Sequence, residues 1–434
     1  MKRTVTFLAA LTVLGCTSAS LATTPTVAAT LEEEPSSPLD CDREVADRYP
    51  AACPVVRRAS DYAGRCVPAE DFAEWGCLLA DSDVELCRGG GTFDVTVLLD
   101  QDGVRVDCAG QTIRHAGAEA HPGVRAPKDR SLRDVTIAGC TIAGTGHAAV
   151  ELMRYFRGDE LNDRLRGHRD VRVEDVEVSD AKFGVYVGAY SRGVVLERVR
   201  VHGAHEVGVY VDASSEDTRV MDSVVEDTRR REGIAIDSST GTQVLRTLTR
   251  GNHGAGIRLF HNCGELRGTV CPIIRPRGAS FNLVAESRIE DGIIVGSRQG
   301  HAYESGWCAT LGGRAGSAPD EARGNVIRDN VFVAPERWAA VAIHTPGNRV
   351  IGNTFAPGQT SDSCLAVHLE PVAFRGRLLP GANLRGTEVI GNQLAPGCRL
   401  QLRHGTPREL TVRGNRSEGG CIQSLGNTCG DGAN

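Results

Sequence analysis

Residues 184–187 (Gly-Val-Tyr-Val), 208–211 (Gly-Val-Tyr-Val), 233–236 (Gly-Ile-Ala-Ile) and 256–259 (Gly-Ile-Arg-Leu) repeat one short pattern. Their glycines are 24, 25 and 23 residues apart. The alternating Val, Ile and Leu residues place apolar side chains on one face at a period of two, as in a half-buried strand. A repeat of this length, built from short strands and turns, is typical of a parallel β-helix coil. The sequence therefore predicts an all-β solenoid.

The repeat extends in both directions from these four segments. A second strand pattern, such as Val171-Arg172-Val173, precedes each of them, so we expect a unit of two strands. Upstream, the pattern reaches residues 95–99. Downstream, asparagines recur after the apolar pattern, and we predict an inward ladder whose amides satisfy turn backbone groups and have no catalytic role. The ladder residues are Asn330, Asn353, Asn392 and Asn415.

The N-terminus has the pattern of an export signal. Lys2-Arg3 is followed by an apolar run, Val5 to Gly15, that is too short to cross a bilayer. Residues 13–16 (Val-Leu-Gly-Cys) resemble a bacterial lipobox, whereas residues 20–22 (Ser-Leu-Ala) suit ordinary cleavage. We therefore predict an exported protein, either an outer-membrane lipoprotein with a lipid on Cys16 or a periplasmic or secreted protein.

The cysteines help to divide the rest of the chain. Of the 15 cysteines, 14 remain once Cys16 is removed, and an even number in an exported chain favours disulfides. Five of them crowd a segment that lacks the repeat, where a small core gains stability from crosslinks. We predict a signal peptide at 1–22 (or a lipoprotein signal ending before Cys16), a flexible tether at 23–40, a helical cysteine-rich cap at 41–88 and the β-helix at 89–434.

The composition excludes several classes of protein. A formal net charge of −6 gives no general affinity for nucleic acid. Aromatic residues make up only 5% of the chain while glycines number 51, which favours short strands and tight turns over helical bundles. No second apolar run is long enough for a transmembrane helix. We expect a monomer that meets a membrane only through a lipid on Cys16.

The repeat resembles the exported right-handed parallel β-helix superfamily over roughly residues 90–420. Residues 232–239 (Glu-Gly-Ile-Ala-Ile-Asp-Ser-Ser) and 256–265 (Gly-Ile-Arg-Leu-Phe-His-Asn-Cys-Gly-Glu) are similar to bacterial members usually grouped with uronate lyases. The superfamily includes pectate lyase-like proteins, alginate lyases, mannuronan C5-epimerases and substrate-binding proteins. The resemblance implies a right-handed parallel β-helix and an enzyme that acts on a polysaccharide.

Two signatures of related enzymes match the chain poorly. Residues 125–130 (Arg-Ala-Pro-Lys-Asp-Arg) fit the R-x-P-x-x-R pattern of pectate lyases, but no tryptophan-containing companion motif precedes them. We interpret this match as coincidental. The adjacent aspartates of polygalacturonases are missing, and residues 252–254 (Asn-His-Gly) match their Gly-His-Gly segment only faintly. Inverting hydrolysis is therefore disfavoured.

The repeat predicts which side chains share one face of the solenoid. If the apolar residues point inward, Tyr186, Tyr210, Ala235 and Arg258 form a solvent-facing column on coils about 4.8 Å apart. The spacing breaks in long insertions after His261 and after Arg298, which we expect to wall a groove. Flanking positions and the first insertion add Lys182, His205, Glu206, Asp212, Arg231, Asp237, His253 and Arg275.

Such a mixture of groups suits β-elimination from a uronate. The C5 proton becomes acidic once the sugar carboxylate is neutralised, a base removes it, and an acid protonates the departing O4. We predict Arg258 or Arg231 as the neutralising group, His261, His205 or Lys182 as the base, and Tyr210 as the acid. Glu232 and Asp237 are expected to orient the base or to bind Ca²⁺. The expected substrate-binding residues are Tyr186, Asp212, His253, Arg275 and Arg298.

We therefore predict a lyase acting on an anionic polysaccharide that contains uronic acid, such as alginate, pectate or a glycosaminoglycan. Three alternatives stay open. Returning the proton to the opposite face of C5 would make the protein an epimerase. A noncatalytic β-helix would only bind the polysaccharide. Asp212 and Asp237, on neighbouring coils, could supply the two carboxylates of a glycoside hydrolase.

Overall fold

The computed structural model describes residues 53–417 and 422–423 of the chain, apart from short gaps. All the described residues belong to one compact unit, Ser37–Asn434. The gaps are residues 73, 90, 115–120, 155–166, 213, 261–277, 297–321, 336–337, 359–363, 372, 375–376, 379–381 and 404–408.

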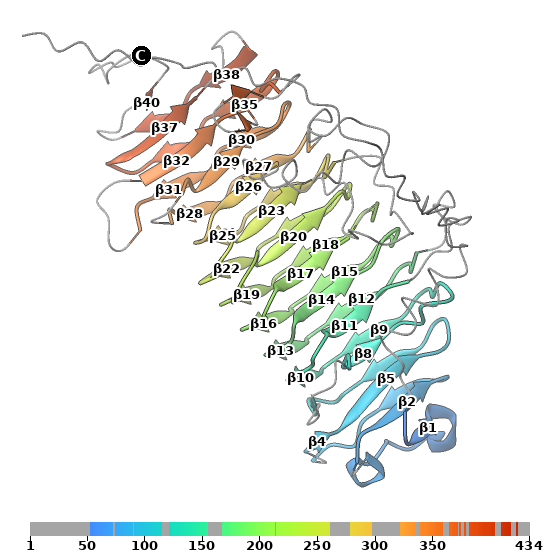
Figure 1. Cartoon of the computed structure of the whole chain (residues 1–434). Helices are drawn as coiled ribbons and strands as arrows, with labels where there is room; N and C mark the ends of the chain where they lie inside the picture. Colours follow the sequence, from blue (N-terminus) through green and yellow to red (C-terminus); the bar gives the residue numbers. More distant parts are fainter. Residues whose placement is uncertain are drawn as a thin grey trace, which may run out of the picture. The chain divides into compact units, whose positions relative to one another are not determined.

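Three parallel β-sheets, here called A, B and C, run through the described coils (Figure 1). Sheet A consists of β1 (Val56–Arg58), β2 (Gly76–Ala80), β5 (Val95–Leu99), β8 (Val124–Arg125), β11 (Ala148–Leu152), β14 (Phe183–Val187), β17 (Val207–Val211), β20 (Ile234–Asp237), β23 (Ile257–Phe260), β26 (Ile293–Val295), β29 (Val341–Ile343), β32 (Cys364–Leu369), β37 (Cys398–Leu402) and β40 (Ile422–Gln423).

Sheets B and C have 12 described strands each. Sheet B consists of β3 (Val84–Glu85), β6 (Arg105–Asp107), β9 (Thr136–Ala138), β12 (Arg172–Glu174), β15 (Val195–Glu197), β18 (Arg219–Met221), β21 (Gln243–Leu245), β24 (Leu283–Ala285), β27 (Val326–Arg328), β30 (Arg349–Ile351), β35 (Thr387–Ile390) and β38 (Leu410–Arg413). Sheet C consists of β4 (Thr92–Phe93), β7 (Thr112–Arg114), β10 (Thr141–Ala143), β13 (Glu177–Ser179), β16 (Arg200–His202), β19 (Val224–Glu226), β22 (Leu248–Arg250), β25 (Arg288–Ile289), β28 (Val331–Val333), β31 (Thr354–Ala356), β36 (Gln393–Leu394) and β39 (Arg416–Ser417). A short antiparallel pair, β33 (Ala373–Phe374) with β34 (Arg377–Leu378), lies outside these sheets.

Each coil contains three strands, so the predicted two-strand unit is wrong. A representative coil runs through β12 in sheet B, β13 in sheet C and β14 in sheet A. Only Asp175 and Val176 separate β12 from β13, and Asp175 makes the turn in the left-handed region at φ +54°. A turn this short leaves no break in the apolar pattern, because the two strands together look like one.

The interior is filled by aliphatic side chains from all three sheets, as the period-two pattern predicts. In sheet A, strand pairing aligns a fully buried column of Val150, Val185, Val209, Ile234 and Ile257. The repeated glycine before this column has a steric reason. A Cβ on Gly208 would lie 2.3 Å from Val225 Cγ1 and 2.6 Å from the carbonyl oxygen of Gly233, so no larger residue fits there without a shift.

The predicted asparagine ladder is confirmed. Each side-chain amide donates to the next coil, with Nδ2–Oδ1 distances of 3.0, 3.0 and 2.8 Å from Asn330 through Asn353 and Asn392 to Asn415. The same Oδ1 atoms accept backbone N–H groups of the preceding coil. The sequence analysis missed a second ladder of the same kind, formed by Asn282, Asn325 and Asn348. These buried amides satisfy turn groups that water cannot reach.

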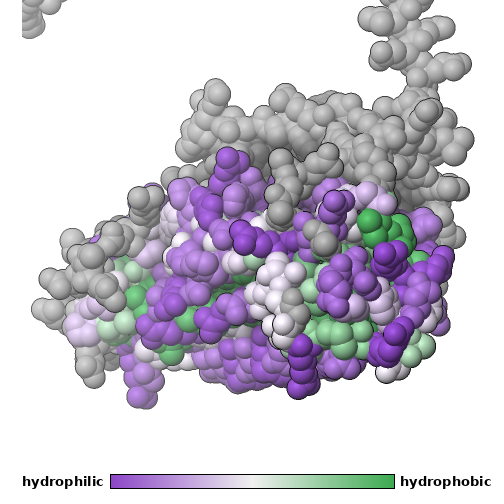
Figure 2. Space-filling model, turned by 90° about the horizontal axis from the view of Figure 1, so that it is seen from below, coloured by the Kyte–Doolittle hydropathy of each residue, from purple (hydrophilic) through white to green (hydrophobic). Residues whose placement is uncertain are grey.

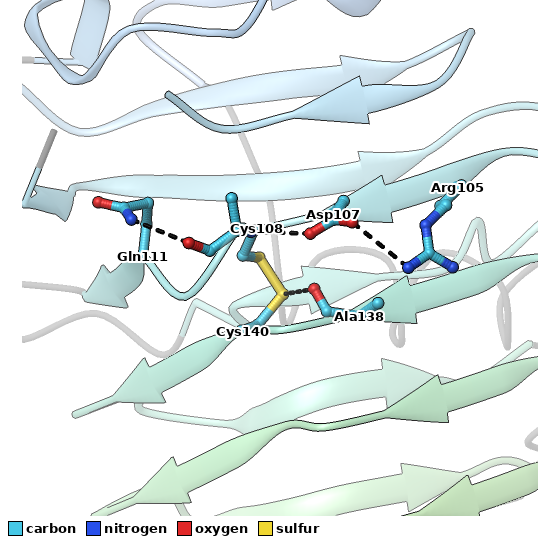
Figure 3. The surroundings of a disulfide bond; sticks show 7 residues. Arg105, Asp107, Cys108, Gln111, Ala138 and Cys140 are labelled. Atoms are coloured by element: carbon cyan, nitrogen blue, oxygen red, sulfur yellow. Dashed lines mark hydrogen bonds and ion pairs between the residues drawn. A yellow bond between two sulfur atoms is a disulfide. The ribbon is translucent and has the colours of Figure 1, made fainter. Parts of the chain in front are cut away.

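Disulfides join neighbouring coils, which confirms the predicted use of eight cysteines. The pairs are Cys53–Cys77, Cys66–Cys87, Cys108–Cys140 and Cys364–Cys398. Figure 3 shows the third pair, in which Cys108 follows β6, Cys140 follows β9 and Gln111 Nε2 donates to the carbonyl oxygen of Ala109 at 3.1 Å. Crosslinks of this number are typical of exported proteins. The other seven cysteines lie outside the described residues.

Two of these disulfides lie in the N-terminal cap, which is confirmed as a small crosslinked segment. Among its described residues, from 53 onward, the helical content is limited to two 3-10 turns, η1 (Ala59–Tyr62) and η2 (Ala69–Phe72). Strands β1, β2 and β3 lie within the same segment and already pair into sheets A and B. The cap therefore continues into the first coils, and its boundary at residue 88 stays a prediction.

Figure 2 views the molecule from below relative to Figure 1, and the described residues on the face that it shows are mostly hydrophilic, with smaller hydrophobic patches between them. No helix among the described residues is long and apolar enough to cross a membrane.

Candidate functional site

The outer face of sheet A carries the residues that the repeat placed on one surface. Strand pairing aligns Glu151, Tyr186, Tyr210, Ala235 and Arg258 on five consecutive coils, from β11 to β23 (Figure 1). The predicted order of the last four is confirmed. Because neighbouring strands of a sheet lie about 4.8 Å apart, Glu151 and Arg258 mark the ends of a face about 19 Å long.

The predicted exposure of this column to solvent is wrong. Tyr210 is 1% exposed, Tyr186 6% and Ala235 0%, and they form an apolar cluster separate from the interior. The rings of Tyr186 and Tyr210 stack with centroids 5.0 Å apart. A period of two identifies the side of a strand that a residue faces, whereas exposure depends on the groups that pack over that side.

Each tyrosine of the column donates its hydroxyl to an aspartate of the following coil. Tyr186 donates to Asp212 Oδ2 at 2.9 Å, and Tyr210 donates to Asp237 Oδ2 at 2.6 Å. Both carboxylates are buried, and Ser238 Oγ also donates to Asp237 Oδ1. The structure therefore brings together four predicted site residues as two hydroxyl–carboxylate pairs.

Arg258 lies two coils beyond Tyr210 and is held by a buried carboxylate. Its Nη1 donates to Glu232 Oε1 at 2.9 Å, and Arg231 Nε lies 3.3 Å from Glu232 Oε2. Burial alone would raise the pKa of Glu232, but the two guanidinium groups hold it below its usual value. The Arg258 guanidinium also covers the ring of Phe260, 4.6 Å from its centroid.

A second group of charged residues lies at the other end of this face and was missed as a site by the sequence analysis. We call Arg125, Lys128, His147 and Glu151 the Glu151 cluster. Glu151 is 2% exposed and lies 3.6 Å from Lys128 Nζ, 3.5 Å from His147 Nδ1 and 3.9 Å from Arg125 Nε. Arg125 pairs with Glu151 across β8 and β11. Arg125 and Lys128 belong to residues 125–130, whose match to the R-x-P-x-x-R pattern is interpreted above as coincidental.

The Glu151 cluster changes the pKa values of its own members. Burial alone would raise the pKa of Glu151, but the hydrogen bond from His147 and the charges of Lys128 and Arg125 lower it to about 2. Burial lowers the pKa of Lys128 to about 8, although the negative charge of Glu151 opposes that change. Glu151 is therefore ionised at neutral pH, while part of Lys128 is an uncharged amine.

Aromatic rings connect the Glu151 cluster with the tyrosine pairs. The Phe183 ring lies 5.8 Å from the His147 ring, 5.5 Å from Tyr186 and 6.1 Å from Tyr210. Lys182 is exposed next to it, with Nζ 5.6 Å from the Phe183 centroid. Lys182 therefore lies next to the aromatic ring that contacts both tyrosines.

The predicted histidines are not gathered at the tyrosine pairs. His205 is exposed in the turn before β17, where its Nε2 lies 3.0 Å from Arg229 Nη1, and Arg229 also bonds Asp180. His253 is exposed in the turn before β23. His261, Arg275 and Arg298 lie outside the described residues, so their roles stay predictions.

The residues named for Ca²⁺ are already engaged by protein groups. Glu232 binds Arg258 and Arg231, and Asp237 accepts from Tyr210 and Ser238. Within the described ranges, no group of three or more His, Cys, Asp or Glu residues is arranged to hold a metal ion.

The coils after β23 present a different outer face. Ile294 and Ala342 continue the column and pack with Ala255 and Ala339 in a small apolar cluster. Further on, His368 lies between Glu370 Oε2 at 2.9 Å and Gln401 Oε1 at 3.1 Å. Asp291 is buried near β26, where its Oδ2 accepts from Asn252 Nδ2 at 2.7 Å. Burial raises the pKa of Asp291 to about 6.

Comparison with known proteins agrees with this architecture. The family model described as "Right handed beta helix region" matches residues 99–270. The chain is a right-handed parallel β-helix. This confirms the fold that the resemblance to the β-helix superfamily implied. No curated protein matches the sequence closely enough to count as a relative.

Solved structures of the same fold cover most of the chain. The crystal structure of the periplasmic alginate epimerase AlgG is 12% identical, covers 87% of this chain and 88% of its own, and has a TM-score of 0.54. A mutant of that epimerase is 13% identical with the same coverage and a TM-score of 0.56. A mutant tailspike protein of E. coli bacteriophage HK620 in complex with a pentasaccharide is 11% identical, covers 88% of this chain and 68% of its own, and has a TM-score of 0.47.

Proposed function

We propose that this protein is a polysaccharide lyase that cleaves a uronic-acid-containing polysaccharide by β-elimination on the outer face of sheet A. One observation carries the proposal. Arg258 is fixed by Glu232 through Nη1, and its side chain keeps 12% of its surface exposed. A guanidinium held on one side and exposed on another can bind a sugar carboxylate, because it presents five N–H groups in a planar fork.

The neighbouring residues complete the chemistry that elimination requires. Arg258 neutralises the carboxylate, which makes the C5 proton acidic, and the Tyr210 hydroxyl supplies the proton to the departing O4. Asp237 orients that hydroxyl at 2.6 Å. Among the predicted bases, Lys182 lies beside the same aromatic residues, whereas His205 faces Arg229. Tyr186 and Asp212 extend the face by one coil and would contact the adjoining sugar.

The chain as a whole suits this substrate. An export signal and disulfides are typical of proteins outside the cytoplasm, where anionic polysaccharides are met. We include Ca²⁺ in the proposal as an ion that would neutralise the uronate carboxylate from the substrate side, where carboxylate oxygens are ligands that it prefers. Its contribution is tested directly by activity with and without a chelator.

Epimerisation at C5 is the second candidate, and the likeness in fold to an alginate epimerase favours it. Both reactions begin with removal of the C5 proton. They differ in the fate of the carbanion, which either expels O4 or takes a proton on the opposite face. A fold likeness at 12% identity does not choose between these outcomes, so the reaction must be read from its product.

The deciding experiment incubates the protein with alginate, polygalacturonate and glycosaminoglycans, each with Ca²⁺ and with chelator. A lyase raises the ultraviolet absorbance as unsaturated uronate forms, and Arg258→Ala lowers that rate by about 10²-fold or more. The control is Arg172→Ala, which removes an exposed arginine of sheet B. Deuterium uptake at C5 without absorbance indicates an epimerase, and new reducing ends without absorbance indicate a hydrolase. Binding of the polysaccharide without any of these products would contradict the lyase, the epimerase and the hydrolase activities alike.

A further inference from the structure

We propose that Phe260 is a positioning residue, one that fixes the orientation of the Arg258 guanidinium and links it to the acid Tyr210. The inference rests on the proposed function and adds to it a residue that lies outside the predicted site. Phe260 ends β23, the strand that carries Arg258, and it pairs with Asp237 across β20 and β23 (Figure 1).

The aromatic ring of Phe260 lies against the guanidinium of Arg258. The guanidinium carbon is 4.6 Å from the ring centroid, a distance at which the face of an aromatic ring attracts a cation. Phe260 is buried and packs in the cluster that contains Tyr186 and Tyr210, so the ring is itself held in place. The attraction is strongest where water is excluded, and the Arg258 side chain keeps only a small part of its surface exposed. Arg258 therefore rests on a fixed aromatic surface.

Phe260 and Glu232 together decide which part of the guanidinium a ligand can meet. Glu232 Oε1 accepts from Nη1 at 2.9 Å, Nε is buried, and the ring covers one face. Nη2 is the terminal nitrogen that Glu232 does not hold, so a uronate carboxylate meets Arg258 there, in the plane of the fork. The direction in which the sugar is held thus depends on the two residues that support Arg258.

The backbone of Phe260 supports the acid of the same reaction. Its carbonyl oxygen accepts the Ser238 N–H at 2.9 Å. Ser238 Oγ donates to Asp237 Oδ1 at 2.8 Å, and Asp237 Oδ2 accepts from the Tyr210 hydroxyl at 2.6 Å. One residue therefore contacts the carboxylate-binding arginine through its ring and the hydrogen bonds of the acid through its backbone. Elimination needs both groups in fixed places, because the carboxylate and the departing O4 are attached to neighbouring carbons of one sugar.

The expected consequence of losing the ring is a lower rate with little change in substrate affinity. The charge of Arg258 remains when the ring is removed, so the sugar carboxylate still binds. Negative charge on that carboxylate grows as the C5 proton leaves, and a guanidinium aimed at it stabilises this transition state. A misaligned guanidinium loses that part of the interaction. We therefore expect kcat to fall while KM stays within about twofold.

The test is a double-mutant cycle on the full-length protein, with kcat measured as ultraviolet absorbance on the uronate polymer that the parent cleaves. Phe260→Leu keeps an apolar side chain in the cluster and removes the ring, and we expect kcat to fall about 10-fold. In an Arg258→Ala background the same change should alter kcat by less than about twofold, because no guanidinium is left to orient. Phe260→Tyr keeps the ring face and should stay within about threefold of the parent. Phe260→Met replaces the leucine variant if the latter does not fold.

The matched control is Phe355→Leu, because Phe355 is an interior residue whose ring stacks on Phe332. It should lower the denaturation midpoint and leave kcat unchanged. Three results would overturn the inference: parental kcat in Phe260→Leu, an equal loss with and without Arg258, or a tyrosine variant as slow as the leucine variant. Each of them, with an active parent protein, leaves the proposed lyase intact. A parent protein that converts no uronate polysaccharide instead refutes the proposed function, and the role of Phe260 with it.

Discussion

Two buried carboxyl groups, Glu151 on β11 and Asp291 in the turn before β26, have opposite pKa changes. Both are removed from water, and in both burial pushes the pKa upward. In Glu151 the hydrogen bond from His147 and the charges of Lys128 and Arg125 overcome burial and lower the pKa to about 2. Asp291 receives hydrogen bonds from Asn252 and nearby backbone groups, without a cationic partner among the causes of its shift, and its pKa rises to about 6.

This difference distinguishes the coil of Glu151 from the coils near Asp291. Neutral amide donors stabilise a carboxylate less than charged ones do, so they do not compensate for the loss of water around Asp291. The cations near Glu151 do compensate for its removal from water, so Glu151 stays ionised on the coil next to that of Tyr186. After β23 the column continues with Ile294 and Ala342, which pack in an apolar cluster, and then with the imidazole of His368 on β32.

Removing the charge of Glu151 should have the largest effect on stability. Glu151→Gln leaves the partly buried Arg125 and Lys128 without their carboxylate. We expect a loss of about 3 kcal/mol in the free energy of unfolding at pH 7, the energy of a pKa lowered from 4.5 to about 2. Because the folded pKa is depressed, this contribution is full above pH 4.5 and disappears as the pH falls toward 2. Chemical denaturation at pH 7 and pH 3 measures it. Equal losses at both values would contradict the assignment.

The contribution of Asp291 to stability should change with pH in the opposite direction to that of Glu151. Its folded pKa is raised, so its contribution to stability is full below pH 3.8 and is lost as the pH rises through about 6. Asp291→Asn should therefore stabilise the protein at pH 8 by about 1–3 kcal/mol and have little effect at pH 3.5. The amide oxygen of the new side chain can still accept from Asn252. A thermal shift of the same size at both pH values would show that titration is not the cause.

The smallest effect on stability is expected at the turn of the Asn ladder, where an earlier coil carries a serine in place of the asparagine. The early coils place Ser223 at the position that Asn353 occupies later, and Ser223 Oγ accepts the Val199 N–H at 3.1 Å. Asn353→Ser should thus keep one acceptor while losing the amide contacts to Asn392 and Ile327, at a cost of about 1 kcal/mol. Asn353→Ala, which has no acceptor, should cost more. Denaturation midpoints of the two variants give the comparison, and an identical midpoint for both would argue against the ladder.

The fold could be predicted because the repeat is local. Alternating aliphatic residues, glycines about one coil apart and the Asn ladder all appear in the sequence at short range, and the order of Tyr186, Tyr210, Ala235 and Arg258 follows from them. The third strand of each coil was not predicted, because a two-residue turn does not interrupt the apolar pattern. The burial of Tyr210 was not predicted, because it depends on aromatic rings from other coils.

The site was harder to predict, because its residues meet across coils of unequal length. Lys128 and Glu151 are 23 residues apart, and nothing between them shows that they share a face until the coils are stacked. The hydrogen bonds of Tyr186 to Asp212 and of Tyr210 to Asp237 each join adjacent coils, and the repeat placed these residues on one face without indicating their pairing. Charged residues can be counted in a sequence, but the extent to which each one is removed from water is known only from the packed structure.

The disulfides also give the described solenoid two reinforced ends. They lie at residues 53–140 and at 364–398, and each closes a loop of about one coil. In a linear array, a coil in the middle is held by two neighbours and a terminal coil by one, so unfolding begins as fraying from the ends. Crosslinks near the ends act where fraying starts, so they help to preserve the strand pairing of the coils between them. The crosslinked coils at the two ends therefore determine how readily fraying reaches the central face.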